Sequence, residues 1–501
     1  MGQNMKGKQI TYQADKLEGK EYAEDPHRIL RGHVIFKHGI TYIFCDSSRY
    51  FHKRNFVEAF GQVKVYHQDD SLYAEELYYD GNIRQVFLRQ NVRYQNHPQK
   101  LLTDSLYYAL PTRTLFFMGY GQLQDSLQIL RSKIGFYEVK SQKSRFFQEV
   151  SLSSADYNLN TDTLYYTTST RQANWSGQSS QIQQNKTHIY MQKAQANLKT
   201  REFTFHESLV QDPEHLFTAK VMEGDLHKKY YKGKGQVALE WTIDSLLLTG
   251  NLSVYQSQLG GSLYENFLGM KFISKDTMFL WGDRLHLLEN PSGDIQTIST
   301  FPNAQILFSD IAARCDSLVY LSQDSIIHLY GNPVLWYGND YQIKSEELRL
   351  YLKDGKLDYA QFEKPFLIGK DSLGYFNQIK GKEADVFFEG DNLDYMHLRG
   401  NGEILHFLLE EDSLLVGMNE LICGEMKVHF ESNKLDRFVF YIDPTGAFIP
   451  PQMLNSENIK LNGFDWKIEE KPHLKTQSKR DSQKYRQHLI QQYLSDPEPS
   501  P

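Results

Sequence analysis

One short pattern recurs along this chain of 501 residues at an almost constant spacing. It consists of a small residue, an acidic residue and then apolar and aromatic residues, as in TDSLYY from Thr103 and TDTLYY from Thr161. The copies that begin at Cys45, Ala74, Thr103, Ser132 and Thr161 follow one another at intervals of 29 residues. A period of this size restricts the fold to a stack of similar units, each covering the apolar face of the next.

A second marker, an apolar segment led by Gly or Asn, runs in phase with the first. It appears as GHVIF at 32–36, GQVKV at 61–65 and NVRY at 91–94, and it returns as GQVAL at 235–239 and GEILHF at 402–407. Gly, Asn and Asp between the markers are typical of turns, and the aromatic residues favour strands. The sequence therefore predicts an all-β fold, an elongated solenoid-like stack built from repeats of about 29 residues.

The repeat indicates which residues face the interior of this stack. The apolar residue two positions before the small residue lies on the same face of a strand, but the next apolar residue follows three positions after it. Strict alternation would place that residue on the opposite face. We therefore expect a β-bulge or a corner at the acidic position, which returns the chain to the interior.

The residues expected inside form one long stripe of aliphatic and aromatic side chains with small residues between them. Such a stripe either fills a core or, where small side chains leave room, lines an apolar groove for a lipid. The candidate groove residues are Ile43, Tyr50, Leu72, Leu77, Tyr79, Leu101, Leu106, Tyr108, Leu159, Leu164, Tyr166, Leu318, Tyr320, Ile343 and Leu348.

The three cysteines, Cys45, Cys315 and Cys423, occupy the small-residue position of their repeats. They lie many repeats apart, so they cannot reach one another within one stack. None of them has the spacing of a zinc site. We interpret them as small buried residues and expect no metal site.

Motifs of catalysis are not found in the sequence, which lacks HExxH, GxSxG, a Walker loop and a dinucleotide fingerprint. Asp46, Asp104, Asp162 and Asp316 recur with the period, whereas catalytic residues occur once, so we interpret them as corner residues that accept backbone N–H bonds. We expect no enzymatic activity, no catalytic residue and no cofactor. Since acidic residues are abundant, a β-helix carbohydrate-active enzyme stays open as an alternative.

Charge and hydropathy argue against a nucleic-acid-binding protein and against a membrane-spanning helix. A net charge of −7 and a pI near 6.2 disfavour nucleic-acid binding, which needs a basic face. No apolar run approaches the roughly 18 residues of a membrane helix. The first ten residues, MGQNMKGKQI, show no apolar core of a signal peptide.

The pairing of the two markers resembles a known family, the OstA-like proteins of lipopolysaccharide transport. The segments that carry the resemblance best are ITYQADKL (10–17), GHVIF (32–36) with IFCDSSRY (43–50), and GQVKV (61–65) with LYAEELYY (72–79). With its length and its many tyrosines, the chain most resembles the longer OstA-like proteins of Bacteroidetes-type bacteria.

This resemblance, which covers about residues 8–450, implies a β-jellyroll or β-taco in which two curved antiparallel sheets clasp an apolar groove. It implies a periplasmic conduit or bridge that holds the acyl chains of lipopolysaccharide or a related lipid on the way to the outer membrane. The implied partners are other β-jellyroll proteins of the transport machinery, which pair through edge strands, and head-to-tail self-association is a further expectation. The main alternative is a structural or adhesive β-solenoid with a filled core.

The repeat register divides the chain into three regions. We expect β-jellyroll repeats over 1–215 and again over 216–450, either as two domains or as one continuous stack. The segment DPTGAFIPP at 443–451 breaks the repeat with three prolines. Because the following residues are charged and poor in large apolar groups, the sequence predicts a largely disordered tail over 451–501, with a short amphipathic helix as the alternative.

Overall fold

The computed structural model describes residues 9–20, 24–273, 276–353, 356–390, 392–410, 414–432, 434–473 and 476–494. Over these residues the chain is built from antiparallel strands, which confirms the all-β prediction. It divides into two compact units. Unit 1 comprises Met1–Pro213, Val221–Leu226 and Tyr493–Pro501, and unit 2 comprises Glu214–Lys220 and His227–Gln492. Strand β16 (His215–Asp225) contributes residues to both.

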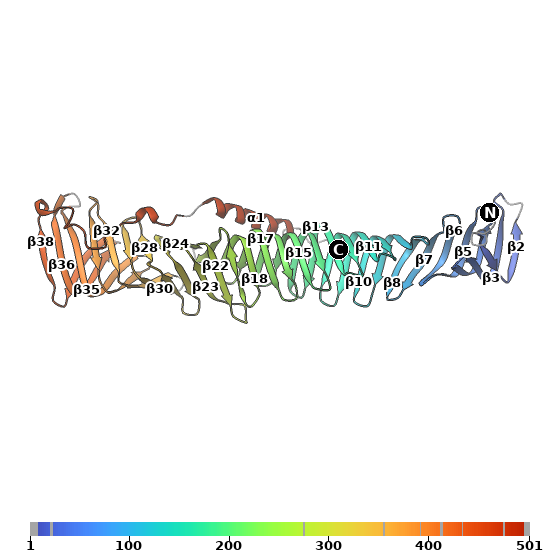
Figure 1. Cartoon of the computed structure of the whole chain (residues 1–501), viewed down its shortest axis with the longest axis horizontal. Helices are drawn as coiled ribbons and strands as arrows, with labels where there is room; N and C mark the ends of the chain where they lie inside the picture. The colour runs from blue at the N-terminus through green and yellow to red at the C-terminus, as the bar shows by residue number, and fades with distance from the viewer. Residues whose placement is uncertain are drawn as a thin grey trace, which may run out of the picture. The chain divides into compact units, whose positions relative to one another are not determined.

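Unit 1 is a meander in which each strand from β3 to β14 pairs with the next, as Figure 1 shows, while β1 and β2 both pair with β3. Its strands are β1 (Thr11–Gln13), β2 (Lys16–Lys20), β3 (His27–His38), β4 (Thr41–Phe51), β5 (Phe56–His67), β6 (Asp70–Asp80), β7 (Gln85–Asn96), β8 (Gln99–Ala109), β9 (Thr114–Gln124), β10 (Gln128–Glu138), β11 (Lys143–Ser154), β12 (Asn158–Thr167), β13 (Gln172–Gln184), β14 (Thr187–Asn197) and β15 (Glu202–Gln211).

Each long strand of unit 1 bends at a β-bulge near its middle. In the pairing of β4 with β5, the register shifts between Phe44 and Ser47, at the level of Asp46. The facing residues Gly61 and Gln62 have φ values of 78° and 43°, and a Cβ on Gly61 would lie 2.6 Å from Oδ2 of Asp46. The predicted corner at the acidic position is therefore confirmed, and a left-handed glycine packs against it.

The bends give unit 1 two arms. Arm A is the half of each strand that ends at the hairpins after β4, β6 and β8, and arm B is the half that ends at the hairpins after β3, β5 and β7. We call the edge that carries both sets of hairpins the mouth, and the line of bulges the corner. Side chains that point inward from both arms form the core, since successive residues of a strand alternate between its faces.

In unit 2 most strands are broken at the corner into two short strands, so that two separate ladders form. Arm A of unit 2 is the ladder of β19 (Gly260–Tyr264), β22 (Arg284–Glu289), β23 (Ile295–Phe301), β26 (Ser317–Leu321), β27 (Ile326–Tyr330), β30 (Glu347–Lys353), β31 (Lys356–Glu363) and β34 (Glu383–Glu389). Arm B is the ladder of β20 (Leu268–Ile273), β21 (Asp276–Trp281), β24 (Ala304–Phe308), β25 (Ile311–Cys315), β28 (Val334–Tyr337), β29 (Tyr341–Lys344), β32 (Phe366–Lys370) and β33 (Phe376–Lys380).

Long strands join the two arms at both ends of unit 2. They are β17 (Tyr230–Trp241) and β18 (Leu246–Gln256) at one end, and β35 (Asn392–Glu410) and β36 (Leu414–Glu431) at the other. β36 pairs last with β37 (Lys434–Tyr441) on arm A and with β38 (Thr445–Ile449) on arm B. The two-sheet architecture is thus that of a β-jellyroll.

The outer face of arm A in unit 1 carries a row of aromatic rings on consecutive strands. Phe87 and Tyr107 stack with ring centroids 4.2 Å apart, and Phe116 and Phe136 stack at 4.5 Å. Because the rings turn their faces toward one another, the row stabilises the pairing of its strands. Part of the high tyrosine and phenylalanine content is thereby explained.

The segment after β38 returns along the outer face of arm B of unit 2, as the red trace in Figure 1 shows. Side-chain amides of two fully buried glutamines hold it. Gln378 donates to the carbonyl of Ile459 (2.9 Å) and accepts from the N–H of Leu461 (2.8 Å). Gln342 makes the same pair of bonds to the carbonyl of Asp465 and the N–H of Lys467. Residues 451–473 thus pack as a strap, which differs from the predicted disordered tail.

Helical structure is confined, within the described ranges, to the end of the chain. Two short 3-10 helices, η1 (Pro451–Met453) and η2 (Ile468–Glu470), interrupt the strap, and α1 (Thr476–Leu494) follows it. On α1, Leu489 is fully buried and the guanidinium of Arg486 is hydrogen-bonded to the carboxylate of Glu240 on β17. The helix alternative for the tail therefore describes this part of the chain.

Candidate binding site between the two arms

The predicted groove residues of unit 1 all lie inside, between arm A and arm B. Their exposed fractions do not exceed 7%, and residues such as Leu77 and Leu106 are fully buried. They therefore form a continuous buried interior, as predicted for the apolar stripe. The eleven residues are Ile43, Tyr50, Leu72, Leu77, Tyr79, Leu101, Leu106, Tyr108, Leu159, Leu164 and Tyr166.

In unit 2, Leu318, Ile343 and Leu348 are buried and Tyr320 is half-buried. Here the two arms leave a cavity of about 130 Å³. Leu318 and Tyr320 contribute to its wall from arm A, and Ile306 contributes from arm B. The other apolar wall residues are Leu246, Leu248, Ile273, Met278, Leu280, Ile295, Ile298, Ile327 and Leu352.

The cavity is apolar inside and polar near the hairpins that connect the strands of each arm, which form the mouth of unit 2. Asp244, Lys271 and Ser322 are the polar side chains at its rim, beside Tyr320. The ammonium group of Lys271 donates to the backbone carbonyl of Asp244. Burial, and next to it the charge of Asp244, raises the pKa of Tyr320, so this hydroxyl stays neutral. Such a shape fits an apolar chain with a polar end directed to the solvent.

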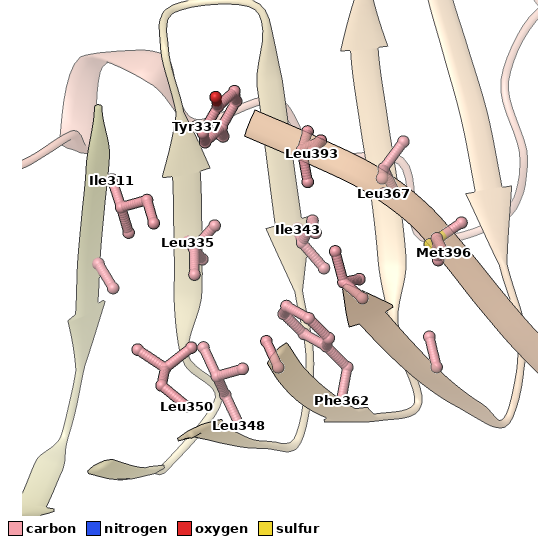
Figure 2. Close-up of a cluster of buried hydrophobic side chains, with 14 of the residues drawn as sticks. Ile311, Leu335, Tyr337, Ile343, Leu348, Leu350, Phe362, Leu367, Leu393 and Met396 are labelled. Carbon is pink, nitrogen blue, oxygen red and sulfur yellow. The ribbon is translucent and has the colours of Figure 1, made fainter. Parts of the chain in front are cut away.

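Farther along unit 2 the space between the arms is filled. Figure 2 shows Leu335, Ile343 and Phe362 among the side chains that come from neighbouring strands and meet in this core. The hollow next to Ile343 measures only about 20 Å³. Room for a ligand between the arms therefore differs along unit 2, although the apolar stripe runs through it.

A polar cluster that the sequence analysis missed closes the mouth of unit 1. At its centre, the fully buried carboxylate of Asp70 accepts two hydrogen bonds of 2.7 Å from the guanidinium of Arg113. Oδ1 of Asp70 also accepts from Tyr94 (2.9 Å) and Asn96 (2.6 Å), and Oδ2 accepts from Tyr108. Burial by itself would raise the pKa of Asp70, but these donors hold it below its usual value, so the carboxylate is charged.

Similar contacts cross the mouth at neighbouring repeats. Tyr79 of arm A is hydrogen-bonded to Nδ1 of His38 of arm B (2.6 Å), and the hydroxyl of Tyr137 donates to Gln99. Burial raises the pKa of both Tyr79 and Tyr137 to about 12. In unit 2, the carboxylate of Glu289 accepts from Trp241 and Tyr255.

The sequence carries a signal for these contacts. Tyr79, Tyr108 and Tyr137 follow one another at 29 residues, and so do Asp70 and Gln99. Tyr79 and Tyr108 are predicted members of the apolar stripe, but their hydroxyl groups bind His38 and Asp70. The polar residue that begins these repeat strands, as Asp70 and Gln99 do, is the sequence signal that predicts a partner for a tyrosine hydroxyl group.

The corner residues and cysteines have the predicted environments. Asp46, Asp104 and Asp162 are exposed at bulges, and Asp316 is exposed in the break between β25 and β26. Their role as acceptors of backbone N–H bonds stays a prediction. The cysteines are free and buried. Burial raises the pKa of Cys45 and Cys315 to about 12, and it also raises the pKa of Cys423. A buried neutral thiol acts as a small apolar group.

The described residues contain no group of three or more His, Cys, Asp or Glu placed to hold a metal ion. No helix within the described ranges is long and apolar enough to span a membrane.

Comparison with known proteins gives a family and a fold neighbour. Residues 6–162 match the model of a family described as OstA-like protein. Among solved structures, the chain is similar to LptH from Pseudomonas aeruginosa, described as the LptA homologous periplasmic component of the conserved lipopolysaccharide transport device. The identity is 16%, the match covers 21% of this chain and 80% of LptH, and the TM-score of 0.20 is too low to carry an argument. No curated protein matches the chain.

Proposed function

Residues 6–162 belong to the OstA-like protein family, and from this premise we propose that the chain is a periplasmic lipid-binding conduit in lipopolysaccharide transport. In this proposal the two arms hold acyl chains between them, and the chain performs no chemistry on its lipid. The match of residues 6–162 to the OstA-like family, the lipopolysaccharide-transport family that the repeat motifs resemble, suggests the compartment and the lipid class.

The observation that carries the proposal is the cavity between the arms of unit 2. A volume of about 130 Å³ accommodates roughly four methylene groups, if each takes about the 30 Å³ of a water molecule. At about 0.8 kcal/mol per buried methylene, the cavity contributes about 3 kcal/mol to the binding of one acyl chain. A lipid with several acyl chains needs more space than this cavity offers, so the arms must separate further to hold it. We propose that the first acyl chain enters at the cavity.

The rim of the cavity supports the same orientation of the lipid. An acyl chain seated against Ile298 and Leu318 places its polar end beside Lys271. The ammonium group of Lys271 then attracts an anionic head group, which stays at the solvent edge and avoids desolvation.

The strands at the ends of the stack suit the proposed partners. β37 and β38 pair with β36, and the described residues supply no further strand for their other edges. An unpaired edge is a template for strand addition, so we propose that another β-jellyroll protein or a second copy of this chain pairs here.

A second candidate function is favoured by the packing of unit 1. Its inward side chains are buried, as expected for a structural solenoid with a filled core. The two candidates differ in whether any lipid enters between the arms.

Displacement of a fluorescent acyl probe tests the proposal. The purified full chain is loaded with a dansyl-labelled dodecyl probe and titrated with lipopolysaccharide, with the detached polysaccharide, which has no acyl chains, as control. We expect lipopolysaccharide to displace the probe and the polysaccharide to leave it bound. A folded chain that never binds the probe is a scaffold, and displacement by the polysaccharide alone means that sugars are recognised in place of acyl chains.

A further inference from the structure

The cluster around Asp70 joins two hairpins that lie on opposite sides of the mouth of unit 1. Asp70 begins β6 at the hairpin after β5, on arm B, and Arg113 lies in the hairpin between β8 and β9, on arm A. The guanidinium of Arg113 binds both carboxylate oxygens at 2.7 Å, the two-bond geometry in which arginine recognises carboxylate or phosphate groups. The two arms are thus tied together directly.

Burial distinguishes this ion pair from another pair that crosses the same mouth. The side chains of Asp70 and Arg113 are 0% and 11% exposed, whereas those of Asp156 and Arg201, which are 3.5 Å apart, are 62% and 47% exposed. An exposed pair contributes little to holding the arms together. A buried pair resists the loss of either partner strongly, because the remaining charge is left without water or counter-charge.

A buried ion pair is nevertheless a poor way to stabilise a permanently closed seam. Apolar side chains of similar size commonly hold such a seam as well or better, since they need no desolvation of charge. Separation of a polar seam returns both charged groups to water and exposes little apolar surface at the rim. The Asp70 cluster therefore suits a seam that opens and closes.

Arg113 also offers an incoming ligand a way to open the seam. A phosphate monoester or diester presents two oxygens to a guanidinium much as a carboxylate does. If such an anion takes the place of Asp70 on Arg113, the tie between the arms is broken while Arg113 keeps a partner. Tyr94 and Asn96, which lie on arm B with Asp70, keep their hydrogen bonds to it, whereas the bond from Tyr108 on arm A breaks together with the tie.

We infer that Asp70 and Arg113 form a latch on the mouth of unit 1, which opens when the phosphoryl group of an acyl lipid replaces Asp70 on Arg113. This inference rests on the proposed lipid function, and it adds a head-group contact and an order of events. The lipid binds Arg113 first, the hairpins separate, and the acyl chains reach Leu106 and its neighbours.

A thiol placed inside unit 1 reports the opening of the latch without any lipid. Val86 is fully buried on arm A and pairs with Tyr79 and Tyr108, so Val86→Cys places a sulfur of similar size just inside the mouth. The three native cysteines are replaced by Ala, which occupies their repeat position naturally at Ala74. The rate of reaction with a thiol reagent then measures how often the mouth of the full chain is open.

Three variants separate a latch from a merely structural cluster. Asp70→Asn removes the charge but keeps the shape, and we expect labelling at least about tenfold faster than in the parent chain. Asp70→Leu with Arg113→Met replaces the ion pair by an apolar contact, and we expect labelling no faster than in the parent. Arg201→Gln breaks the exposed pair and should leave the rate unchanged. Parent-like labelling of folded Asp70→Asn would overturn the latch.

If Asp70→Asn fails to fold, Tyr108→Phe provides the same test with a smaller loss of stability. It removes one hydrogen bond to Asp70 and keeps the ring, so a smaller acceleration is expected. No acceleration in a folded Tyr108→Phe chain would overturn the latch as well.

Three small probes identify the opening ligand. Dodecyl phosphate below its micelle concentration should accelerate labelling of the parent chain, whereas dodecanol and inorganic phosphate should not. The apolar double variant should lose the response to dodecyl phosphate. Equal acceleration by dodecanol would refute the exchange on Arg113, and equal acceleration by inorganic phosphate would show that a free anion is the ligand.

The same experiment distinguishes failure of the latch from failure of the conduit. Fast labelling of Asp70→Asn, together with no acyl binding to either unit, leaves Asp70 and Arg113 as the tie that holds the mouth closed, but refutes both the acyl lipid as its opening ligand and the lipid function. Acyl binding in unit 2 with no change of labelling in any variant refutes the latch and leaves the conduit.

Discussion

A pair of identical substitutions in unit 2 tests whether the cavity between its arms is real space for an acyl chain. Ile298 and Ile343 are both 7% exposed and both point into the interior. Ile298 borders the cavity of about 130 Å³, whereas Ile343 borders a hollow of about 20 Å³. The change of either residue to Phe adds a ring to the core, so the available space decides the outcome.

The magnitudes follow from the two volumes. Unfilled core space costs about 24 cal/mol per Å³, so the larger cavity corresponds to about 3 kcal/mol that a filling side chain can partly recover. We expect Ile298→Phe to change the free energy of unfolding by less than about 1 kcal/mol. Ile343→Phe has no comparable space, and overpacking should cost it about 1–3 kcal/mol.

The two substitutions should also differ in their effect on ligand binding. A phenyl ring exceeds the isoleucine side chain by about the volume of one methylene, so Ile298→Phe should weaken binding of the dodecyl probe by at least about 0.8 kcal/mol, or roughly fourfold. Ile343→Phe should leave probe binding near that of the parent chain. Urea unfolding and probe titration measure the two quantities. Equal destabilisation by both variants, or equal probe affinity, would refute the assignment of the cavity.

Three further outcomes are expected. Burial, and then the charge of Arg84, lowers the pKa of His67 in the folded chain. Because the unfolded chain binds the proton more tightly, the free energy of unfolding should fall as the pH drops below about 6.5, by up to about 1.4 kcal/mol per pH unit. His67→Gln should reduce this fall, as measured by urea titrations between pH 7.5 and 5.5. Leu106→Ala should cost about 2–5 kcal/mol of unfolding free energy, whereas Leu102→Ala, on the outer face of the same strand, should cost less than 1 kcal/mol. Gln378→Ala should accelerate amide hydrogen exchange at Leu461 while exchange at Lys467, which Gln342 holds, changes less.

Much of the fold followed from the repeat. A stack of strands is specified locally, because each repeat carries its own turn residues, its small residue and its aromatic end. The distance of three positions between Thr103 and Leu106 predicts the corner, since a period of two cannot place both inside. Burial of Cys45 in the position that Ala74 fills elsewhere has the same origin.

The recurring polar residues of the mouth could be found in the repeat, but their partners could not be predicted, because the pairing depends on contacts between distant repeats. Asp70 and Arg113 are 43 residues apart, and nothing in either repeat indicates that their hairpins meet. A stripe of Tyr residues predicts apolar packing, while the fate of each hydroxyl depends on the opposite arm. The register of one arm against the other therefore determines which polar groups meet across the mouth.

The C-terminal strap was missed for a related reason. Its charge and low content of large apolar residues are typical of disorder. Its partner, Gln342, lies 123 residues before Asp465 and binds backbone atoms, which leave no trace in the sequence of the strap. Main-chain recognition of this kind becomes visible only in the structure.

Photo-cross-linking at two adjacent residues tests the lipid conduit most directly. Leu318 lines the cavity of unit 2, and its neighbour Val319 points to the opposite face of β26. With a photoreactive amino acid at either position in cells that make lipopolysaccharide, we predict a lipopolysaccharide adduct from position 318 and none from position 319. Equal adducts from both positions, or none from position 318 in a folded chain, would contradict an acyl site between the arms.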